Sequence, residues 1–368
     1  MTQLWKEMDK PLLISILMLF LIGMATLYAA VHTGDTSLWI KQGLYWVIGM
    51  GVFFLVCLIP LRMVAMISWP AYVVSLFFLV LVPMIGVVQM GARRWLDLGI
   101  INLQPSEMMK WALMLALAYW FAAREANTIP SLGVAAALVA IPAALTAIQP
   151  DLGTALVLMA SASVIIFCAG LPWLWLGAMA LIVLISLPIA YANLHEYQKD
   201  RIHTFIDPQS DPLGAGYHVI QSSIAIGSGG ITGQGYLQGS QSRLQFLPEQ
   251  HTDFIFAVLA EEGGLVEVTI LLLIYGFMIS RIVNIAAEAN TRYSSMLCLG
   301  IATIFSLYTI VNIGMVSGML PVVGVPLPFI SYGGSALVTM LAALGMVMRT
   351  AIESKSRVSW QRMGSPLS

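Results

Sequence analysis

The residue best suited to acid–base chemistry in this sequence is Asp253, which follows His251 and stands at the start of a long apolar run. Restricted solvation raises the pKa of a carboxylate and a neighbouring cation lowers it, so such a group can act as general base for a hydroxyl. A helix N-cap at a membrane surface is the structural alternative. A metal site on His251 and Asp253 is disfavoured, because the spacing supplies no third or fourth ligand.

A second stretch combines cations with a candidate ion pair. Arg94 and Trp95 precede a segment in which Glu107 and Lys110 stand three residues apart. On a helix these two side chains share a face and can pair, and we expect Ser106 to cap that helix. Ionisable groups at membrane depth are costly and therefore candidates for function, although a purely structural ion pair at the start of a helix is the alternative.

Two further stretches are rich in polar or small residues. Gln149 and Asp151 lie between two short apolar runs, where Asp151 either takes part in binding or caps the next helix through the amide of Thr154. The segment 207–235 is rich in glycine, but Thr232 stands where a nucleotide-binding G-x-G-x-x-G pattern needs Gly. We expect these glycines to allow tight turns and close approach of the backbone to a phosphate-bearing headgroup.

Composition excludes several classes of protein. Of the 368 residues, 59% are hydrophobic and only 10% are charged, whereas a soluble domain carries about 25% charged residues. This excludes a soluble enzyme and a disordered chain. The three cysteines each lie in an apolar run, which excludes a disulfide scaffold. The net charge of −1 offers no basis for a nucleic-acid partner.

The apolar runs predict an all-α polytopic membrane protein. About 20 apolar residues cross a bilayer, and such spans must be helices because every backbone amide needs a partner within its own segment. We predict ten transmembrane helices at about 11–31, 44–60, 64–83, 107–123, 134–148, 155–170, 172–192, 254–280, 295–318 and 333–350.

The basic residues orient these spans. With both termini cytoplasmic, ten Lys and Arg residues lie on the inner side and seven on the outer side. We therefore predict one transmembrane domain over 1–368, with a large extracytoplasmic loop at about 193–253, before the eighth helix, and a cytoplasmic tail at about 351–368. That loop has apolar anchors, so we expect it to be packed, with a short amphipathic helix around 217–226.

Function is expected on the outer side, because the outer loops carry most of the unusual residues. These loops are 84–106, 149–154, 193–253 and 319–332. The Pro- and Gly-broken stretch 321–335, which contains Ser331, predicts a re-entrant loop shielded from lipid. Glu261, Glu262 and Glu267 lie within the eighth span and are expected to face the bundle interior or a cavity.

With these residues considered together, the chain resembles the SEDS family (shape, elongation, division and sporulation proteins) over roughly 10–350, and its elongation branch more than its division branch. The strings that carry the resemblance are Arg94-Trp-Leu-Asp97, Gln104-Pro-Ser-Glu107, Gln149-Pro-Asp-Leu-Gly-Thr154, Asp211-Pro-Leu-Gly-Ala-Gly-Tyr217, His251-Thr-Asp-Phe-Ile-Phe-Ala257 and Gly324-Val-Pro-Leu-Pro-Phe-Ile-Ser-Tyr-Gly-Gly-Ser335.

The resemblance implies a ten-span peptidoglycan glycosyltransferase of the bacterial inner membrane. Such a protein polymerises lipid II for cell-wall elongation together with a class B penicillin-binding protein. The family's essential aspartate corresponds to Asp253, its arginine–tryptophan pair to Arg94 and Trp95, and its glutamate–lysine pair to Glu107 and Lys110. Glu267 departs from the pattern, since a small residue is expected there, and this affects the expected packing of the eighth helix.

Residues and resemblance together predict a mechanism. Asp253 deprotonates the 4-hydroxyl of the acceptor sugar, whose oxygen displaces a polyprenyl pyrophosphate with inversion. Arg94, Lys110 and Arg201 are the candidate cations for the pyrophosphate. A divalent ion, Mg²⁺ or Mn²⁺, could help to neutralise the pyrophosphate, although the sequence shows no set of metal ligands. The further residues predicted to contact the substrate are Trp95, Glu107, Gln149, Asp151 and Ser331.

Two other functions remain open at this point. The first is a lipid II flippase or other transporter, although transporters place ionisable residues near the bilayer midplane and usually show internal repeats. The second is a non-catalytic membrane scaffold for wall-synthesis enzymes, which would not need an outer cluster of carboxylates and cations.

Overall fold

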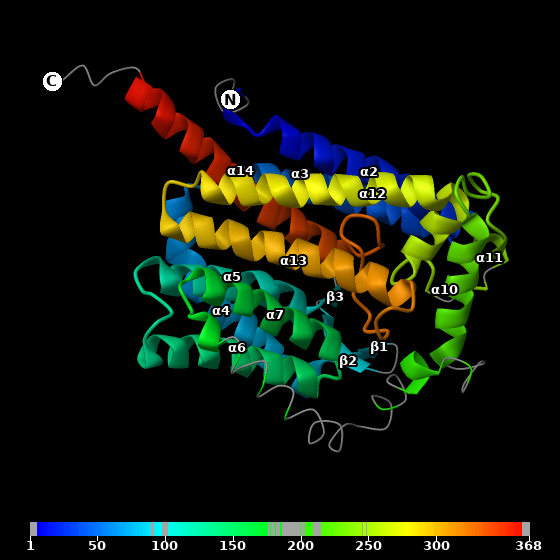
Figure 1. Ribbon diagram of the computed structural model, residues 1–368, viewed down its shortest axis with the longest axis horizontal. Coiled ribbons are helices and arrows are strands. Elements are labelled where there is room, and N and C mark those ends of the chain that lie inside the picture. The colour runs from blue at the N-terminus through cyan, green and yellow to red at the C-terminus, as the bar shows by residue number, and fades with distance from the viewer. Residues whose placement is uncertain are drawn as a thin grey trace.

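The computed structural model describes residues 6–89, 92–97, 102–175, 203–207, 215–244, 246–247 and 249–362, together with residues 177, 181, 185, 199 and 209. Long helices run side by side along the longest axis of the molecule (Figure 1). They are α2 (Lys10–Val31), α3 (Ser37–Leu58), α4 (Leu61–Ile85), α5 (Pro105–Ala122), α6 (Ile129–Ile148), α7 (Leu152–Cys168), α12 (Ile255–Ala287), α13 (Arg292–Val316) and α14 (Gly334–Arg362).

The helices confirm an all-α polytopic membrane protein. Within the described residues, seven are long and apolar enough to cross a membrane, namely α2, α3, α4, α6, α12, α13 and α14. The helices α5 and α7 also coincide with predicted spans, while the predicted span 172–192 falls mostly outside the described residues. The count of ten spans and the cytoplasmic location of the termini therefore stay predictions.

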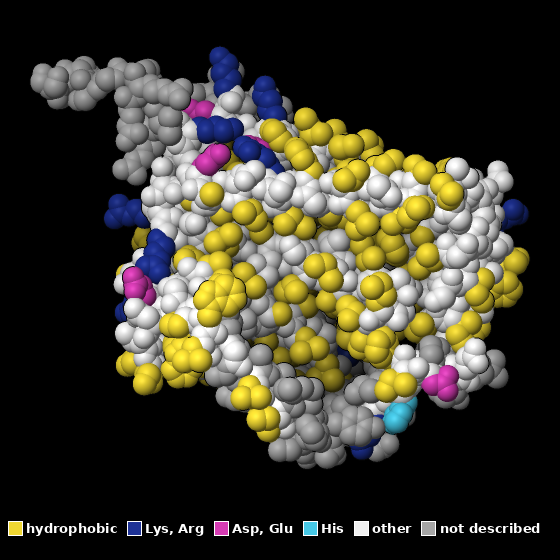
Figure 2. All heavy atoms as spheres, viewed as in Figure 1, with side chains coloured by type: hydrophobic (Ala, Val, Ile, Leu, Met, Phe, Trp, Pro, Cys, Tyr) yellow, Lys and Arg dark blue, Asp and Glu magenta, His cyan; other side chains and the backbone are white. Residues whose placement is uncertain are grey.

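Lipid-facing and basic surfaces are separated in the way a membrane protein requires. Large apolar side chains such as Val47, Met66 and Met84 are exposed on α3 and α4. Lys and Arg side chains gather near the start of α2, beyond the hydrophobic side chains that lie over α12 and α13 (Figure 2). This arrangement agrees with the orientation predicted from the basic residues.

The helix α5 is the centre of the bundle. It packs against α4, α6, α7, α13 and α14, and fourteen of its eighteen residues are buried. The helix begins at Pro105, with Gln104 as the N-cap residue and no side-chain cap. The prediction that Ser106 caps this helix is therefore wrong, because proline's fixed φ suits the first helical position and the helix starts one residue earlier.

The outer loop between α4 and α5 contains a small sheet that the sequence analysis did not predict. The strands β1 (Val87–Gln89), β2 (Ala92–Asp97) and β3 (Asn102–Leu103) pair antiparallel in that order. Val87 lies opposite Trp95, and Leu96 lies opposite Leu103. The sheet lies at the end of the bundle where α10 and α11 are found (Figure 1).

In the large outer loop, α10 (Ala215–Gly229) confirms the predicted amphipathic helix, and a short α11 (Ser240–Arg243) follows. The segment after α10 crosses α12 where that helix is interrupted by Gly264, whose φ is 63°. The amides of Gln234 and Gly235 donate to the carbonyls of Glu261 and Glu262, at 3.0 Å each. The crossing thus satisfies backbone groups that the interruption of α12 leaves open.

The three glutamates of α12 are accommodated at this crossing. Glu261 and Glu262 are buried, as expected. The carboxylate of Glu261 accepts the amides of Gln241 and Ser242 at the start of α11, at 2.8 and 3.2 Å. Glu267 lies against Gly263, where a Cβ atom would fall 1.7 Å from its Oε2. A glycine one turn earlier therefore makes room for the side chain that departs from the family pattern.

Replacing Gly233 by Ala is expected to lower the melting temperature of the purified protein more than replacing Gly230. Both residues have positive φ, 78° and 54°, which costs a residue with a Cβ about 1–2 kcal/mol. Only at Gly233 would the Cβ also collide with a neighbour, the carbonyl oxygen of Glu262 at 1.9 Å. Thermal unfolding in detergent measures both effects, and equal losses would contradict the steric argument.

At the opposite end, Asp9 joins three helices. It caps α2 by accepting the amide of Leu12 at 3.1 Å, and Arg281 of α12 donates to both carboxylate oxygens. Lys355 of α14 lies 3.7 Å away. Burial acts to raise the pKa of Asp9, but the bonds from Arg281 and Leu12 and the charges of Arg281 and Lys355 outweigh it and hold that pKa below its ordinary value of 3.8.

Asp9→Asn is expected to unfold at a lower temperature than wild type at pH 7, and the difference is expected to shrink in acid. A carboxyl whose pKa is lowered by folding stabilises the protein above its unfolded pKa and loses that effect as pH falls through the folded value. Thermal unfolding between pH 3 and pH 7 tests this. A difference independent of pH, or the same behaviour in Glu7→Gln, would contradict it.

Candidate active site

Asp253 lies in a turn that an irregular segment holds in place. This segment, residues 319–333, connects α13 to α14 and returns into the bundle beside the turn (Figure 1). Its Ser331 hydroxyl donates to the carbonyl of Thr252 at 2.7 Å, and the amide of Tyr332 donates to the carbonyl of His251 at 2.9 Å. The predicted re-entrant loop therefore exists, and Ser331 acts on the backbone that carries Asp253.

Asn312 of α13 ties the turn and the irregular segment together. Its side-chain amide donates to the carbonyl of Asp253 at 3.0 Å and to that of Val325 at 2.7 Å. Asn312 is fully buried, so its removal would leave two carbonyls without their donor. On the other side of the turn, a Cβ at Gly324 would lie 3.4 Å from Oδ2 of Asp253. The carboxyl of Asp253 therefore faces a position without a side chain.

Asp253 is not the residue at the N-cap position of the helix that follows it. The helix α12 begins at Ile255, with Phe254 and not Asp253 as the N-cap residue. In the described part of the chain, no three His, Cys, Asp or Glu side chains converge on a common point that could hold a metal ion. Asp253 is thus neither the N-cap of α12 nor part of a protein-built metal cage among the described residues.

The pair Glu107–Lys110 forms as predicted, but inside the bundle. The ammonium of Lys110 is 2.5 Å from Oε1 of Glu107 and 4.1 Å from the ring centre of Tyr308, whose hydroxyl also reaches Glu107 at 3.4 Å. Lys110 is 0% exposed and Glu107 is 4% exposed. Glu107 and Tyr308 enclose the ammonium of Lys110, so it is shielded from water. In this low-dielectric interior its electrostatic interactions with neighbouring groups are stronger than they would be in water.

Arg94, Gln149 and Asp151 meet at the start of α7. The guanidinium of Arg94 donates to the carbonyls of Gln149 and Pro150, and the side-chain amide of Gln149 donates to the carbonyl of Leu79 on α4 at 2.8 Å. Asp151 caps α7 by accepting the amide of Thr154 at 3.2 Å, as the structural alternative predicted. Asp151 also attracts the ammonium of Lys110 electrostatically.

Contacts of α7 and α13 connect the turn of Asp253 with the Glu107–Lys110 pair and with the residues at the start of α7. Tyr308, which contacts Glu107 and Lys110, stands four residues before Asn312, which holds Asp253. Four residues are about one helical turn, or about 6 Å along the axis. At the start of α7, a Cβ at Gly153 would lie 2.7 Å from the carbonyl of Val323. The irregular segment 319–333 therefore packs against both Asp253 and the start of α7.

For two of the predicted site residues, Trp95 and Arg201, the structure shows no side-chain contact with the rest of the site among the described residues. Trp95 is half-buried on β2, where its backbone pairs with Val87. Arg201 lies outside the described residues, so its predicted role stays a prediction. The other predicted residues lie at the turn of Asp253, in the first turns of α5, or beside the start of α7.

Sequence reasoning missed three residues of the site. Asn312 and Tyr308 are polar or aromatic residues inside an apolar span, and their spacing of four was the available signal. His218 of α10 stacks on Phe254, with ring centres 5.5 Å apart. Burial lowers the pKa of His218, partly opposed by the negative charge of Glu249. His218 thus favours the neutral form next to the turn of Asp253.

These features define a helical integral membrane protein with a carboxylate-centred site at the end of the bundle away from its basic surface. The chain belongs to the FtsW/RodA/SpoVE family of cell cycle proteins, whose sequence model matches residues 6–356. It is 50% identical to peptidoglycan glycosyltransferase MrdB of Escherichia coli K12 over 280 residues, 75% of each chain. It is 33% identical to stage V sporulation protein E of Bacillus subtilis, covering 94% of this chain and 98% of that one.

Solved structures agree. The chain superposes on one chain of a peptidoglycan synthase complex that coordinates polymerization and crosslinking, with a TM-score of 0.82 and 32% identity, covering 94% of this chain and 98% of that one. It superposes on rod shape determining protein RodA of Thermus thermophilus with a TM-score of 0.73 and 29% identity, covering 94% and 97%. The fold and the family inferred from the sequence are therefore confirmed.

Lys110→Met is expected to destabilise the protein by about 3–5 kcal/mol, because it leaves Glu107 as an unpaired buried charge. Adding Glu107→Gln is expected to restore most of that loss, since no buried charge then remains. Thermal unfolding of the two single variants and the double variant measures the coupling. A double variant no more stable than Lys110→Met would show that the pair is not coupled in the folded protein.

Proposed function

We propose that this chain is a peptidoglycan glycosyltransferase of the bacterial inner membrane that polymerises lipid II on the outer face, with Asp253 as its general base. The activity is the one its relatives carry in their names. The observation that supports the role of Asp253 is its placement. Its backbone carbonyl is held by Asn312, and its carboxyl faces the side-chain-free position of Gly324.

The proposed reaction uses the residues as follows. The carboxylate of Asp253 takes the proton of the acceptor sugar's 4-hydroxyl, and the resulting oxygen attacks the anomeric carbon of the lipid-linked glycan. The bond between that carbon and the polyprenyl pyrophosphate breaks, with inversion, and the pyrophosphate leaves with the bonding electron pair. A base that is fixed before the substrate arrives does not have to be reoriented during the reaction.

Cations at the start of α7 stabilise the leaving pyrophosphate in this proposal. The guanidinium of Arg94 is oriented by two carbonyls of the segment 149–150, and Arg–phosphate contacts are among the stronger charge-assisted bonds. Lys110 contributes a buried positive charge, which Glu107 and Tyr308 hold in place. Arg201 is proposed as a third cation, and Trp95, Gln149 and Asp151 as residues lining the path of the substrate.

A divalent cation stays a prediction. Because the described residues build no metal cage, no step of the proposed reaction runs through Mg²⁺ or Mn²⁺. A class B penicillin-binding protein is proposed as the partner, since the peptidoglycan synthase complex that resembles this chain couples polymerization to crosslinking.

The alternative of a flippase or transporter has less support. The ionisable residues of the site lie in the first turns of α5, at the N-cap of α7 and just before α12. They therefore lie near one end of the bundle, although Glu107 and Lys110 are buried there, whereas transporters bind their substrates near the midplane. A non-catalytic scaffold would not require this set of oriented carboxylates and cations.

Asp253→Asn is expected to lower polymerisation of lipid II by about 10²–10⁴-fold, the contribution typical of a general base. The assay uses the purified full chain with its penicillin-binding partner and measures glycan strands, while thermal unfolding confirms the fold. Asp35→Asn removes an exposed carboxylate from the same face and is expected to retain activity.

Each alternative gives its own result in this assay. Wild-type rates from a folded Asp253→Asn protein would refute the assignment of the base. No polymer from wild type in the presence of its partner would favour a scaffold. Transfer of lipid II across vesicle membranes without polymer would favour a flippase.

A further inference from the structure

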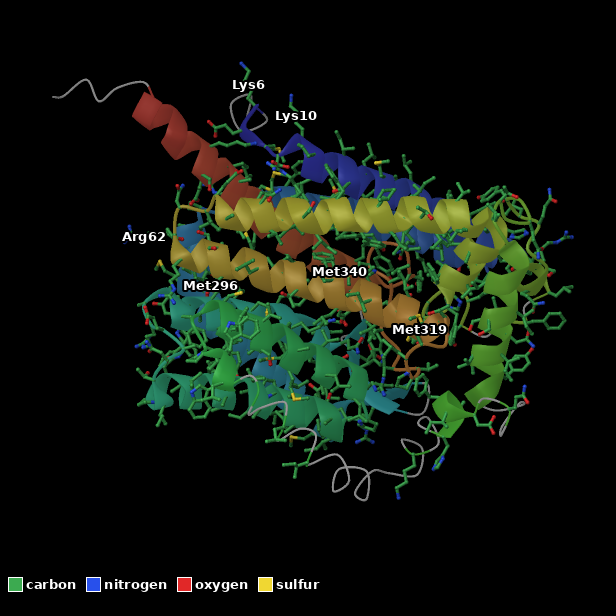
Figure 3. The ribbon with its side chains drawn as sticks, viewed as in Figure 1. Lys6, Lys10, Arg62, Met296, Met319 and Met340 are labelled. Atoms are coloured by element: carbon green, nitrogen blue, oxygen red, sulfur yellow. The ribbon has the colours of Figure 1, made fainter. Side chains whose placement is uncertain are left out.

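A cavity of about 300 Å³ lies at the end of the bundle remote from Asp253. It is bounded by the first turns of α4 and α13 and by residues 350–354 of α14. Arg62, at its edge, lies at the opposite end of the bundle from Met319, where the irregular segment 319–333 begins (Figure 3). This is the end predicted to face the cytoplasm, and the mechanism proposed above makes no use of it.

The walls of the cavity are apolar or already hydrogen-bonded. Glu353 accepts from Arg349 at 2.8 Å and from the amide of Leu61 at 3.0 Å. The carbonyl of Glu353 accepts the side chain of Asn290 at 2.9 Å, and the hydroxyl of Tyr293 is 3.0 Å from that of Ser68. The carboxylate in the lining is thus neutralised by its own arginine and exerts little repulsion on an anion.

Arg62 differs from these groups. Its side chain is exposed and lines the cavity, and within the described residues its guanidinium makes no ion pair or hydrogen bond. Its neighbours on the outer surface of α4, Met63 and Met66, are 58% and 69% exposed, as expected for side chains that face lipid. An unpaired cation therefore stands beside an apolar cavity, next to side chains expected to face lipid.

We propose that this cavity binds an anionic phospholipid of the cytoplasmic leaflet. The phosphate binds the guanidinium of Arg62, and an acyl chain lies along the apolar wall formed by Leu61, Ala65 and the ring of Tyr293. One cation matches a headgroup with one net negative charge, and basic pockets between helices on the cytoplasmic side are suited to such lipids. The positive end of the α13 dipole adds to the attraction.

The test is retention of lipid by the purified full-length chain. The protein is exchanged into detergent containing phosphatidylglycerol or phosphatidylethanolamine, and native mass spectrometry counts the lipid that stays bound. Wild type is expected to retain more phosphatidylglycerol than phosphatidylethanolamine. Arg62→Gln is expected to retain about tenfold less phosphatidylglycerol than wild type, which is the scale of one charge-assisted bond. Lys10→Gln removes a charge from the same end, away from the cavity, and is expected to behave as wild type.

A second variant tests the cavity itself. Ala65→Leu leaves Arg62 intact but fills part of the apolar wall, so it is expected to reduce retention while thermal unfolding shows that the protein is folded. Equal retention in wild type and Arg62→Gln, or equal retention of the two lipids, would overturn the proposal. So would displacement of phosphatidylglycerol by inorganic phosphate alone, because the site would then recognise a free anion and not a lipid.

Discussion

The structure depends on satisfying the backbone of residues 319–333 inside a helical bundle. A segment without regular structure at that depth exposes amides and carbonyls that cannot bond to lipid. Here Ser331 and Tyr332 of the segment bond directly to the turn of residues 251–253, and Asn312 bonds both to Val325 of the segment and to Asp253 of the turn. The contacts that make the irregular segment tolerable are thus the same contacts that position Asp253.

A second constraint is charge burial. A lysine at 0% exposure is tolerated only with a close partner, and Glu107 provides it at 2.5 Å. The ring of Tyr308 adds a favourable face for the ammonium. Because Tyr308 and Asn312 lie one turn apart on α13, the buried pair and the turn of Asp253 share one rigid element. Stability and orientation of the site are therefore properties of the same helix.

The sequence predicted the helices well, because long apolar runs allow one solution in a membrane. It also predicted the pairing of Glu107 with Lys110, since i,i+3 spacing is local. It missed the sheet of residues 87–103, whose strands of two to six residues are too short to give a periodic signal. It missed Asn312 because its partners, Asp253 and Val325, are distant in sequence or lie in an irregular segment, and only the tertiary fold brings them together.

The position of α10 has a mechanical consequence. Through His218 it lies on Phe254, next to Asp253; through Ser222 it bonds to the carbonyl of Val316 at the end of α13; and the segment after it crosses the interruption of α12. A displacement of α10 would therefore bear on Phe254, on the end of α13 and on the interruption of α12, which are all close to or continuous with the turn of Asp253. The position of Asp253 therefore depends on how the outer loop packs as well as on the helical bundle.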